Sequence, residues 1–186
     1  MSVVNRQKFI AGLTKSGVLS DDALDQWRGN ISEDAESLEL ARDLVAKELV
    51  TNWQAKMLLK GAAKLTIGNF LLVERLGKSE LGDLFAAFHQ QLSRKVSIQY
   101  LTSELSRDPE KKKKLFALGS KLAELDHPNL LHIFDVDEEG DRIYLVSEVG
   151  SVTPLVEHLA KHPTLTCPEV AKLILGSLKG LSLIHI

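Results

Sequence analysis

The sequence contains a single cysteine, little net charge and no long apolar run, and each absence excludes a class of protein. Because Cys167 is the only cysteine, no intrachain disulfide framework can form, which indicates a reducing compartment. The 23 basic and 25 acidic residues leave a net charge of -2, which gives no general case for binding nucleic acid or a membrane surface. No stretch approaches the roughly 18 apolar residues of a membrane-spanning helix, and the first residues lack the apolar core of a signal peptide. We therefore expect a cytoplasmic protein with no membrane segment within this chain.

The first 64 residues are predicted to be helical throughout. Apolar residues recur there at helical spacing in four short stretches, which are bounded by glycines and by residues that cap helices. The last stretch, "TNWQAKMLLKG", has Thr51 or Asn52 as its expected N-cap. We expect these helices to form a small bundle, with Trp27 and Trp53 in its core.

From Leu65 the apolar pattern changes from a helical to an alternating period. "TIGNFLLVERLG", "DLFAAFHQQLS" and "RKVSIQYLT" are strand candidates separated by turn signals. Asp108 is expected to cap a helix that begins at Pro109, with an apolar stripe at Leu115, Leu118, Leu122 and Leu125. A hairpin follows, made by "LLHIFDVDEEG" and "DRIYLVSEV", and the remaining sequence predicts two helices separated around Pro163. The pattern predicts an α+β fold.

Several motifs resemble, in order and in spacing, the small lobe of a protein kinase. "LGKSELGDLF" resembles the glycine-rich loop of that family, with Gly77 and Gly82 at the first and third glycines and Ser79 in place of the second. "VSIQYL" resembles the third strand, V-A-I-K-x-L, with Ser97 for the alanine and Gln99 for the lysine.

Two later segments and the helical front extend this resemblance. "ELDHPNLLHIFDV" and "IYLVSEV" resemble the end of helix C, the fourth and fifth strands and the hinge, which implies that Ser147 is the gatekeeper and that Glu148 begins the hinge. His127 is expected to shape the turn before the fourth strand. "WQAKMLLKG", followed closely by "IGNFLL", is similar to the segment before the kinase domain of planctomycete-type bacterial serine/threonine kinases.

The resemblance implies a three-part chain. Residues 65–150 are expected to form the small lobe, a five-stranded antiparallel sheet with helix C across it. Residues 1–64 would form the helical module before it, and residues 151–186 the start of an incomplete helical large lobe. The catalytic His-Arg-Asp and metal-binding Asp-Phe-Gly motifs of the family would follow Ile186, so no catalytic residue and no metal ligand is assigned. The last six residues, "LSLIHI", match the translation of a transposon end used in sequencing libraries. We expect residues 181–186 to be foreign, with a native helix of the form "GL-x-x-I-H" as the alternative.

Neutral residues stand where the family has an ion pair. In kinases the strand lysine contacts the α and β phosphates of ATP and pairs with a glutamate of helix C, whereas the matching positions here are Gln99 and Leu118. Because both charges are replaced together, no unpaired charge is left to bury, and Leu118 is predicted to be a core residue. Lys78 is the candidate for a relocated lysine, and Lys95 is expected to be exposed.

These observations predict a degenerate nucleotide site and leave three functions open. The site is expected to include Leu76, Gly77, Ser79, Gly82, Leu84, Ser97, Gln99, Ser147 and Glu148. ATP binding should be weak, and no other cofactor is assigned. The first hypothesis is a pseudokinase that acts in signalling by binding a partner protein. The second is a divergent active serine/threonine kinase whose catalytic loop lies beyond the truncation, and the third is a helical interaction module on a kinase-like scaffold. No nucleic acid partner is expected.

Overall fold

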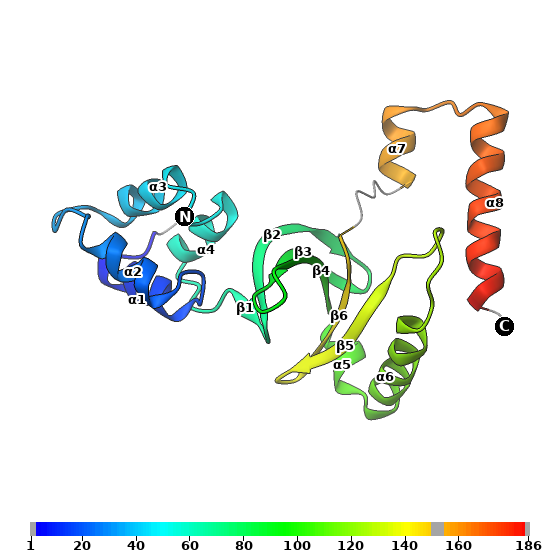
Figure 1. The fold of residues 1–186 in the computed structure, drawn as a ribbon, viewed down its shortest axis with the longest axis horizontal. Coiled ribbons are helices and arrows are strands. Elements are labelled where there is room, and N and C mark those ends of the chain that lie inside the picture. The colour runs from blue at the N-terminus through cyan, green and yellow to red at the C-terminus, as the bar shows by residue number, and fades with distance from the viewer. Residues whose placement is uncertain (1–2, 150–154, 185–186) are drawn as a thin grey trace. The chain divides into compact units, whose positions relative to one another are not determined.

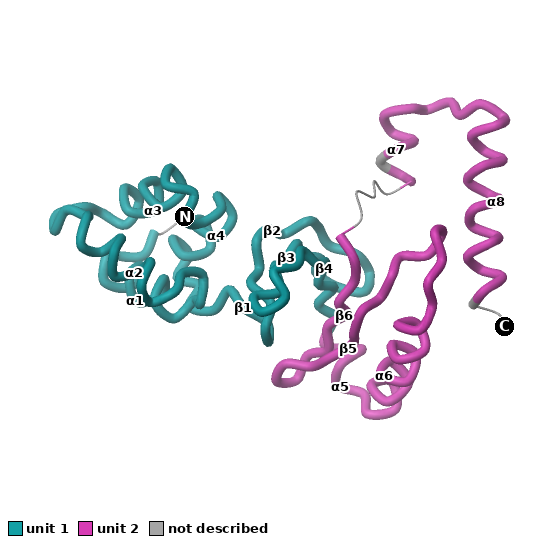
Figure 2. Tube along the Cα trace, viewed as in Figure 1, with its two compact units in different colours: residues 1–102 teal, residues 103–186 magenta. Residues whose placement is uncertain are grey.

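The computed structural model describes residues 3–149 and 155–184 (Figure 1). The chain divides into two compact units, residues 1–102 and residues 103–186, and each is described here by itself (Figure 2). The first unit contains both the helical module and the first predicted strands. The predicted boundary after residue 150 and the last two residues of the segment expected to be foreign lie outside the described residues.

Four short helices open the first unit. They are α1 (Arg6–Lys15), α2 (Asp21–Arg28), α3 (Ser37–Ala46) and α4 (Asn52–Leu59). Side-chain oxygens of Asn5, Ser20 and Thr51 accept hydrogen bonds from the first turns of α1, α2 and α4, so each of these helices begins at a polar residue that satisfies an otherwise unpaired N–H group. The prediction that Thr51 or Asn52 caps α4 is resolved in favour of Thr51.

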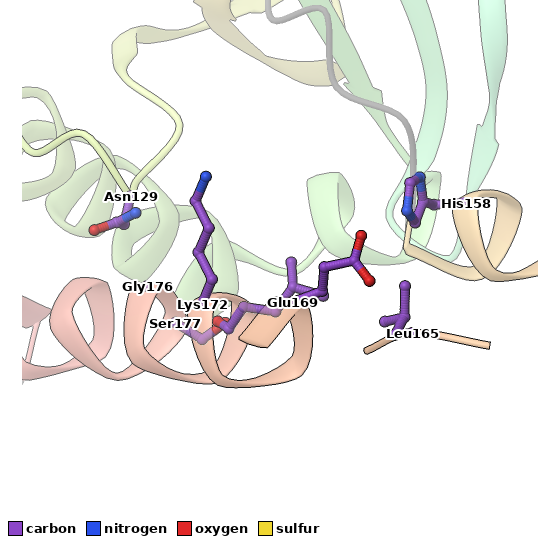
Figure 3. Close-up of a pocket in the computed structure, with 8 residues that line it drawn as sticks. Asn129, His158, Leu165, Glu169, Lys172, Gly176 and Ser177 are labelled. Atoms are coloured by element: carbon purple, nitrogen blue, oxygen red, sulfur yellow. The ribbon is translucent and has the colours of Figure 1, made fainter. Parts of the chain in front are cut away.

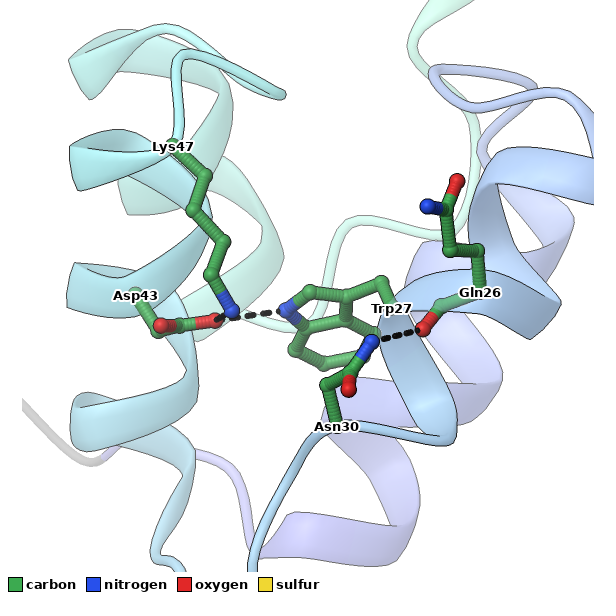
Figure 4. Close-up of polar contacts among 5 residues, drawn as sticks. All are labelled: Gln26, Trp27, Asn30, Asp43 and Lys47. Atoms are coloured by element: carbon green, nitrogen blue, oxygen red, sulfur yellow. Dashed lines mark hydrogen bonds and ion pairs between the residues drawn. The ribbon is translucent and has the colours of Figure 1, made fainter.

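The four helices enclose an apolar core. Its buried members are Phe9, Leu13, Leu24, Trp27, Leu40, Ala41, Leu44, Val50, Ala55, Leu58 and Leu65. The prediction that Trp27 is a core residue is confirmed, since only 3% of it is exposed. Its indole Nε1 donates to Asp43 Oδ2 at 2.8 Å, and Lys47 Nζ donates to the same oxygen at 2.8 Å (Figure 4). The hydrogen bond from Lys47 is the largest cause of a lowered pKa for the Asp43 carboxyl, and the bond from Trp27 acts in the same direction.

The strands of the first unit form an antiparallel run. They are β1 (Thr66–Ile67), β2 (Phe70–Ser79), β3 (Gly82–His89) and β4 (Arg94–Leu101), each paired with the next. The single strand expected from "TIGNFLLVERLG" is divided at Gly68, whose φ of 52° reverses the chain. The described residues therefore contain six strands, four here and two in the second unit, instead of the predicted five.

The helical module is bonded to the sheet through the N-terminus of α4. The pairing of β2 with β3 shifts between Leu72 and Glu74, so Val73 has no partner on β3. The carbonyl of Val73 accepts a hydrogen bond from Thr51 Oγ1 at 2.7 Å, and the carbonyl of Leu72 accepts one from Gln54 Nε2 at 2.7 Å. Gln54 is 3% exposed, and its Oε1 accepts from the Thr51 N–H at 2.8 Å. The residues that cap α4 thus also bind the irregular part of β2.

The second unit contains the predicted helix, the predicted hairpin and the two predicted tail helices. Its elements are α5 (Ser103–Arg107), α6 (Pro109–Ala123), β5 (Ile133–Glu139), β6 (Arg142–Glu148), α7 (Leu155–Lys161) and α8 (Cys167–Ile184). Asp108 Oδ1 accepts hydrogen bonds from the first turn of α6, as expected for its cap. The short helix α5 was not expected, and it places Ser106 Oγ 3.1 Å from the N–H of Ile143 on β6.

The prediction that Leu118 is a core residue is wrong. Leu118 is 49% exposed, whereas its neighbour Gly119 is buried. A Cβ atom at Gly119 would lie 2.1 Å from Cγ2 of Val136, so α6 contacts β5 closely at a position where only glycine fits. Consecutive helical residues point in directions about 100° apart around the helix axis. Because Gly119 faces β5, Leu118 points away from the centre of this contact.

Candidate functional site

The turn between β2 and β3 requires a glycine at residue 82, the third glycine position of the expected glycine-rich motif. Ser79 pairs with Gly82, which leaves Glu80 and Leu81 as the loop, and Ser79 Oγ accepts a hydrogen bond from the Leu81 N–H at 3.2 Å. Gly82 has a φ of 140°, and a Cβ atom there would lie 2.0 Å from the carbonyl oxygen of Tyr100 on β4. The geometry of the hairpin therefore explains Gly82 without a ligand. Gly77 differs, because a Cβ atom there would meet no atom within 4 Å.

Three predicted site residues share one face of the sheet. Leu84 pairs directly with Gln99 and Ala86 pairs with Ser97, and residues paired in this way point to the same side. Ser97 is 8% exposed. Gln99 Nε2 is buried and has no hydrogen-bond partner among the described residues. A buried donor without an acceptor costs about 1–3 kcal/mol, and a ligand that offered an acceptor on this face would remove that cost.

The other predicted residues of the hairpin are more exposed. Leu76 lies at a second shift in the pairing of β2 with β3, between Arg75 and Gly77, and it is 50% exposed. Lys78 is exposed, and so is Lys95, as predicted. Sequence reasoning missed that Arg75 binds Asp83 across the hairpin, with Nη2 and Oδ1 2.5 Å apart. The opposite charges on either side of the glycine-rich turn were the signal that could have indicated this pair.

The two remaining predicted residues belong to the second unit. Ser147 is 6% exposed, and Glu148 is hydrogen-bonded to His132, the residue before β5. The N–H of His132 donates to Glu148 Oε1 at 3.1 Å, and the N–H of Glu148 donates to the His132 carbonyl at 3.0 Å. The predicted role of His127 is confirmed, because its Nδ1 accepts a hydrogen bond from the N–H of Asn129 at 3.1 Å within the turn.

A cavity of about 450 Å³ also lies in the second unit (Figure 3). Asn129, His158 and residues of α8 line it, and the Glu169 side chain extends towards His158. The Glu169 carboxylate accepts hydrogen bonds from the N–H and hydroxyl groups of Thr166, which lower the pKa of this carboxyl. That carboxylate is therefore already bound at the N-terminus of α8.

The described residues contain no group of three or more histidine, cysteine or acidic side chains that could hold a metal ion. Within the same residues, no helix combines the length and apolar character needed to cross a membrane. Cys167 is exposed at the start of α8.

Comparison with known proteins decides the family. The family described as "Protein kinase domain" matches residues 70–186. The chain belongs to the protein kinase family. Serine/threonine-protein kinase Pkn1 of Myxococcus xanthus is 31% identical over 88 residues, which are 47% of this chain and 13% of that protein. A probable serine/threonine-protein kinase, MARK-A of Dictyostelium discoideum, is 26% identical over 102 residues, which are 54% of this chain and 10% of that protein. The kinase-like chain thus spans a small part of these relatives.

Solved kinase structures show the same fold. The crystal structure of the Mycobacterium tuberculosis PknI kinase domain has a TM-score of 0.56 at 20% identity, over 60% of this chain and 46% of that chain. A mutant form of the same domain has a TM-score of 0.59 at 20% identity, over 63% of this chain and 48% of that chain. The mixed helix and sheet structure with its curled antiparallel sheet is therefore a kinase small-lobe fold, as predicted, and the chain spans less than half of these solved domains.

Proposed function

We propose that this kinase-like domain is a pseudokinase that acts in signalling by binding a partner protein and does not transfer phosphate. The observation that carries the proposal is Gln99, a neutral side chain on β4 at the position that matches the phosphate-binding lysine of the family. Its buried Nε2 has no acceptor among the described residues. Gln99 can donate a hydrogen bond to a ligand, but it adds no positive charge.

The charge matters because phosphoryl transfer depends on positioning and on neutralising the phosphates. An ammonium group adds Coulomb attraction to its hydrogen bond with an oxyanion, whereas an amide supplies the hydrogen bond without a positive charge. Lys78 and Lys95, the two cations considered as replacements for the strand lysine, are both exposed. We therefore expect weak ATP binding that hardly depends on magnesium, with adenosine bound nearly as well as ATP.

Calorimetry on the parent chain and on Gln99→Lys tests this proposal. ATP with magnesium, ATP without magnesium and adenosine are each titrated into both proteins. Gln99→Lys should raise the affinity for ATP about tenfold, because the ammonium group adds an attraction to the phosphates that the amide lacks, and should change the affinity for adenosine little. Gln91→Lys adds the same charge at an exposed turn position and serves as the matched control. The titrations are repeated with the chain extended by its downstream gene sequence.

The second candidate is a divergent active serine/threonine kinase. It is favoured by the coverage of less than half of the solved kinase domains, since catalytic motifs could be encoded further downstream. Tight, magnesium-dependent binding of ATP by the parent would contradict the pseudokinase proposal and direct attention to Lys78. Downstream DNA that encodes His-Arg-Asp and Asp-Phe-Gly in register would support the active kinase, and phosphate transfer from labelled ATP would establish it.

A further inference from the structure

A groove of about 660 Å³ lies between α4 and the β2–β3 hairpin of the first unit. It shares only Gly77 with the residues predicted to bind a nucleotide. Phe85 lines the groove, whereas its neighbour Leu84 belongs to the face that carries Gln99. Since adjacent strand residues point to opposite sides, the groove lies on the other face of the hairpin. It is therefore a separate candidate for binding.

The floor of the groove is apolar and partly aromatic. Trp53 on α4 and Phe85 on β3 meet edge to face, with ring centroids 5.8 Å apart. Leu65 and Leu72, which are 3% and 8% exposed, lie below them. Trp53 itself is only half-buried, so the prediction that it is a core residue holds in part. An amphipathic ligand could cover the exposed part of this aromatic pair.

The rim of the groove is positively charged. Lys56 on α4, Lys60 at the C-cap of α4, Lys64 before β1 and Arg75 on β2 all line it, and no acidic residue does. Acidic residues outnumber basic ones in the whole chain, at 25 to 23, so this local excess of cations is not a reflection of composition. Among the described residues neither the Lys56 nor the Lys60 side chain has an acidic partner, whereas Arg75 binds Asp83. The field at the rim therefore favours a ligand with several negative charges.

We infer that this groove binds an acidic peptide segment of a partner protein, with one aromatic or branched apolar side chain against Trp53 and Phe85. Its carboxylates would lie beside Lys56 and Lys60. A volume of 660 Å³ is in the range of about 300–1,000 Å³ that is usual for ligand pockets, and it has room for one large side chain and its neighbours. Apolar anchors with a charged rim are typical of protein–peptide recognition.

This inference rests on the protein-binding part of the proposed function and names the chemistry of the partner. It does not depend on the nucleotide site. If the peptide fails to bind while ATP binding is weak, only the inference fails. If the peptide binds while ATP binds tightly with magnesium, only the pseudokinase assignment fails.

The two tryptophans provide the test. The probe is a short synthetic peptide of glutamates around one central phenylalanine, titrated into the ¹⁵N-labelled chain while the two indole N–H signals are followed by NMR. The Trp53 signal should shift and saturate, whereas the Trp27 signal should stay, because that indole is buried and bonded to Asp43. A peptide with lysine in place of each glutamate, and one with alanine in place of phenylalanine, should bind at least about tenfold more weakly. Binding of the acidic peptide should weaken as salt is added.

Charge-reversal variants then locate the contact. Lys56→Glu with Lys60→Glu should lower the affinity about tenfold, since each change replaces an attraction by a repulsion. Lys8→Glu with Lys15→Glu changes the net charge equally on α1, away from the groove, and should leave the affinity within about twofold. If the reversed pair does not fold, Lys56→Gln with Lys60→Gln gives a smaller decrease in the same direction. Absence of a saturating Trp53 shift, equal binding of the lysine peptide, equal weakening by the α1 pair, or self-association of the chain through this groove would overturn the inference.

Discussion

Substituting Gly119 by alanine should destabilise the second unit, although the same change stabilises an ordinary helix. In an exposed helix interior, alanine is favoured over glycine by about 0.8–1.0 kcal/mol. Here the added Cβ would lie 2.1 Å from Cγ2 and 2.8 Å from Cβ of Val136, whereas non-bonded carbons are normally about 3.5–4.0 Å apart. Overpacking of this kind costs about 1–3 kcal/mol, and the helix gain of about 1 kcal/mol offsets part of that cost, so we expect a net loss of up to about 2 kcal/mol in the free energy of unfolding.

The measurement must report on the second unit. Both tryptophans lie in the first unit, so their fluorescence would miss the effect. Hydrogen exchange of the backbone amides of β5 and β6, with urea unfolding followed by circular dichroism, reports on the affected contact. Shortening the partner as well, in Gly119→Ala with Val136→Ala, should recover part of the loss, with a coupling free energy of at least about 0.5 kcal/mol.

Ser120→Ala is the matched control on the same helix. Ser120 is exposed, and its hydroxyl donates to the Phe116 carbonyl within the helix at 3.1 Å, so alanine there should change stability by about 0.5 kcal/mol or less. If Gly119→Ala exchanges more slowly than the parent, helix propensity decides the outcome, and α6 does not contact β5 as closely as described.

Two further predictions concern the first unit. Gln54→Ala removes a buried donor to the Leu72 carbonyl and should lower the free energy of unfolding by about 1–3 kcal/mol, measured by urea unfolding with tryptophan fluorescence. Gln91→Ala at an exposed turn is the control and should change stability little. If Gln54→Ala is as stable as the parent, the amide does not hold α4 to β2. The pKa of the Asp43 carboxyl is lowered from 3.8 in the folded chain, so the stabilisation by this carboxylate is present above pH 3.8 and is lost as the pH falls through the lower folded value. Asp43→Asn should therefore make the free energy of unfolding depend less steeply on pH below about pH 4. An unchanged dependence on pH in that range would contradict this.

The parts of the fold that the sequence predicted correctly depend on local signals. The caps at Thr51 and Asp108 are read from one polar residue before an apolar period, and the structure contains both sets of bonds. The hairpin of β5 and β6 likewise follows from two apolar runs around an acidic turn. These features could be predicted because the atoms that interact are close in sequence.

The errors concern contacts that apolar periodicity does not encode. The stripe of leucines on α6 indicated a buried Leu118, but a helix can rotate towards a glycine when a β-branched residue faces it, and glycine adds nothing to an apolar pattern. The basic groove was missed for a related reason. Its cations come from α4 and its C-cap, from the segment before β1 and from β2, and only the folded chain brings them to one rim.

The glycines of the hairpin also show why a motif and its role must be argued separately. Gly82 is required by the carbonyl of Tyr100, so its presence would be expected in a chain that binds no nucleotide. Gly77 has no such steric reason, and it lies on β2 just beyond the Leu72 and Val73 carbonyls that bind Gln54 and Thr51. The helical module is therefore bonded to the same strand that carries the first glycine of the motif. Since the acidic-peptide groove also borders Gly77, a partner bound there would contact the glycine-rich hairpin directly, from the face opposite Gln99. In a domain whose strand lysine is replaced by an amide, the face with the groove carries the positive charge that the face with Gln99 lacks.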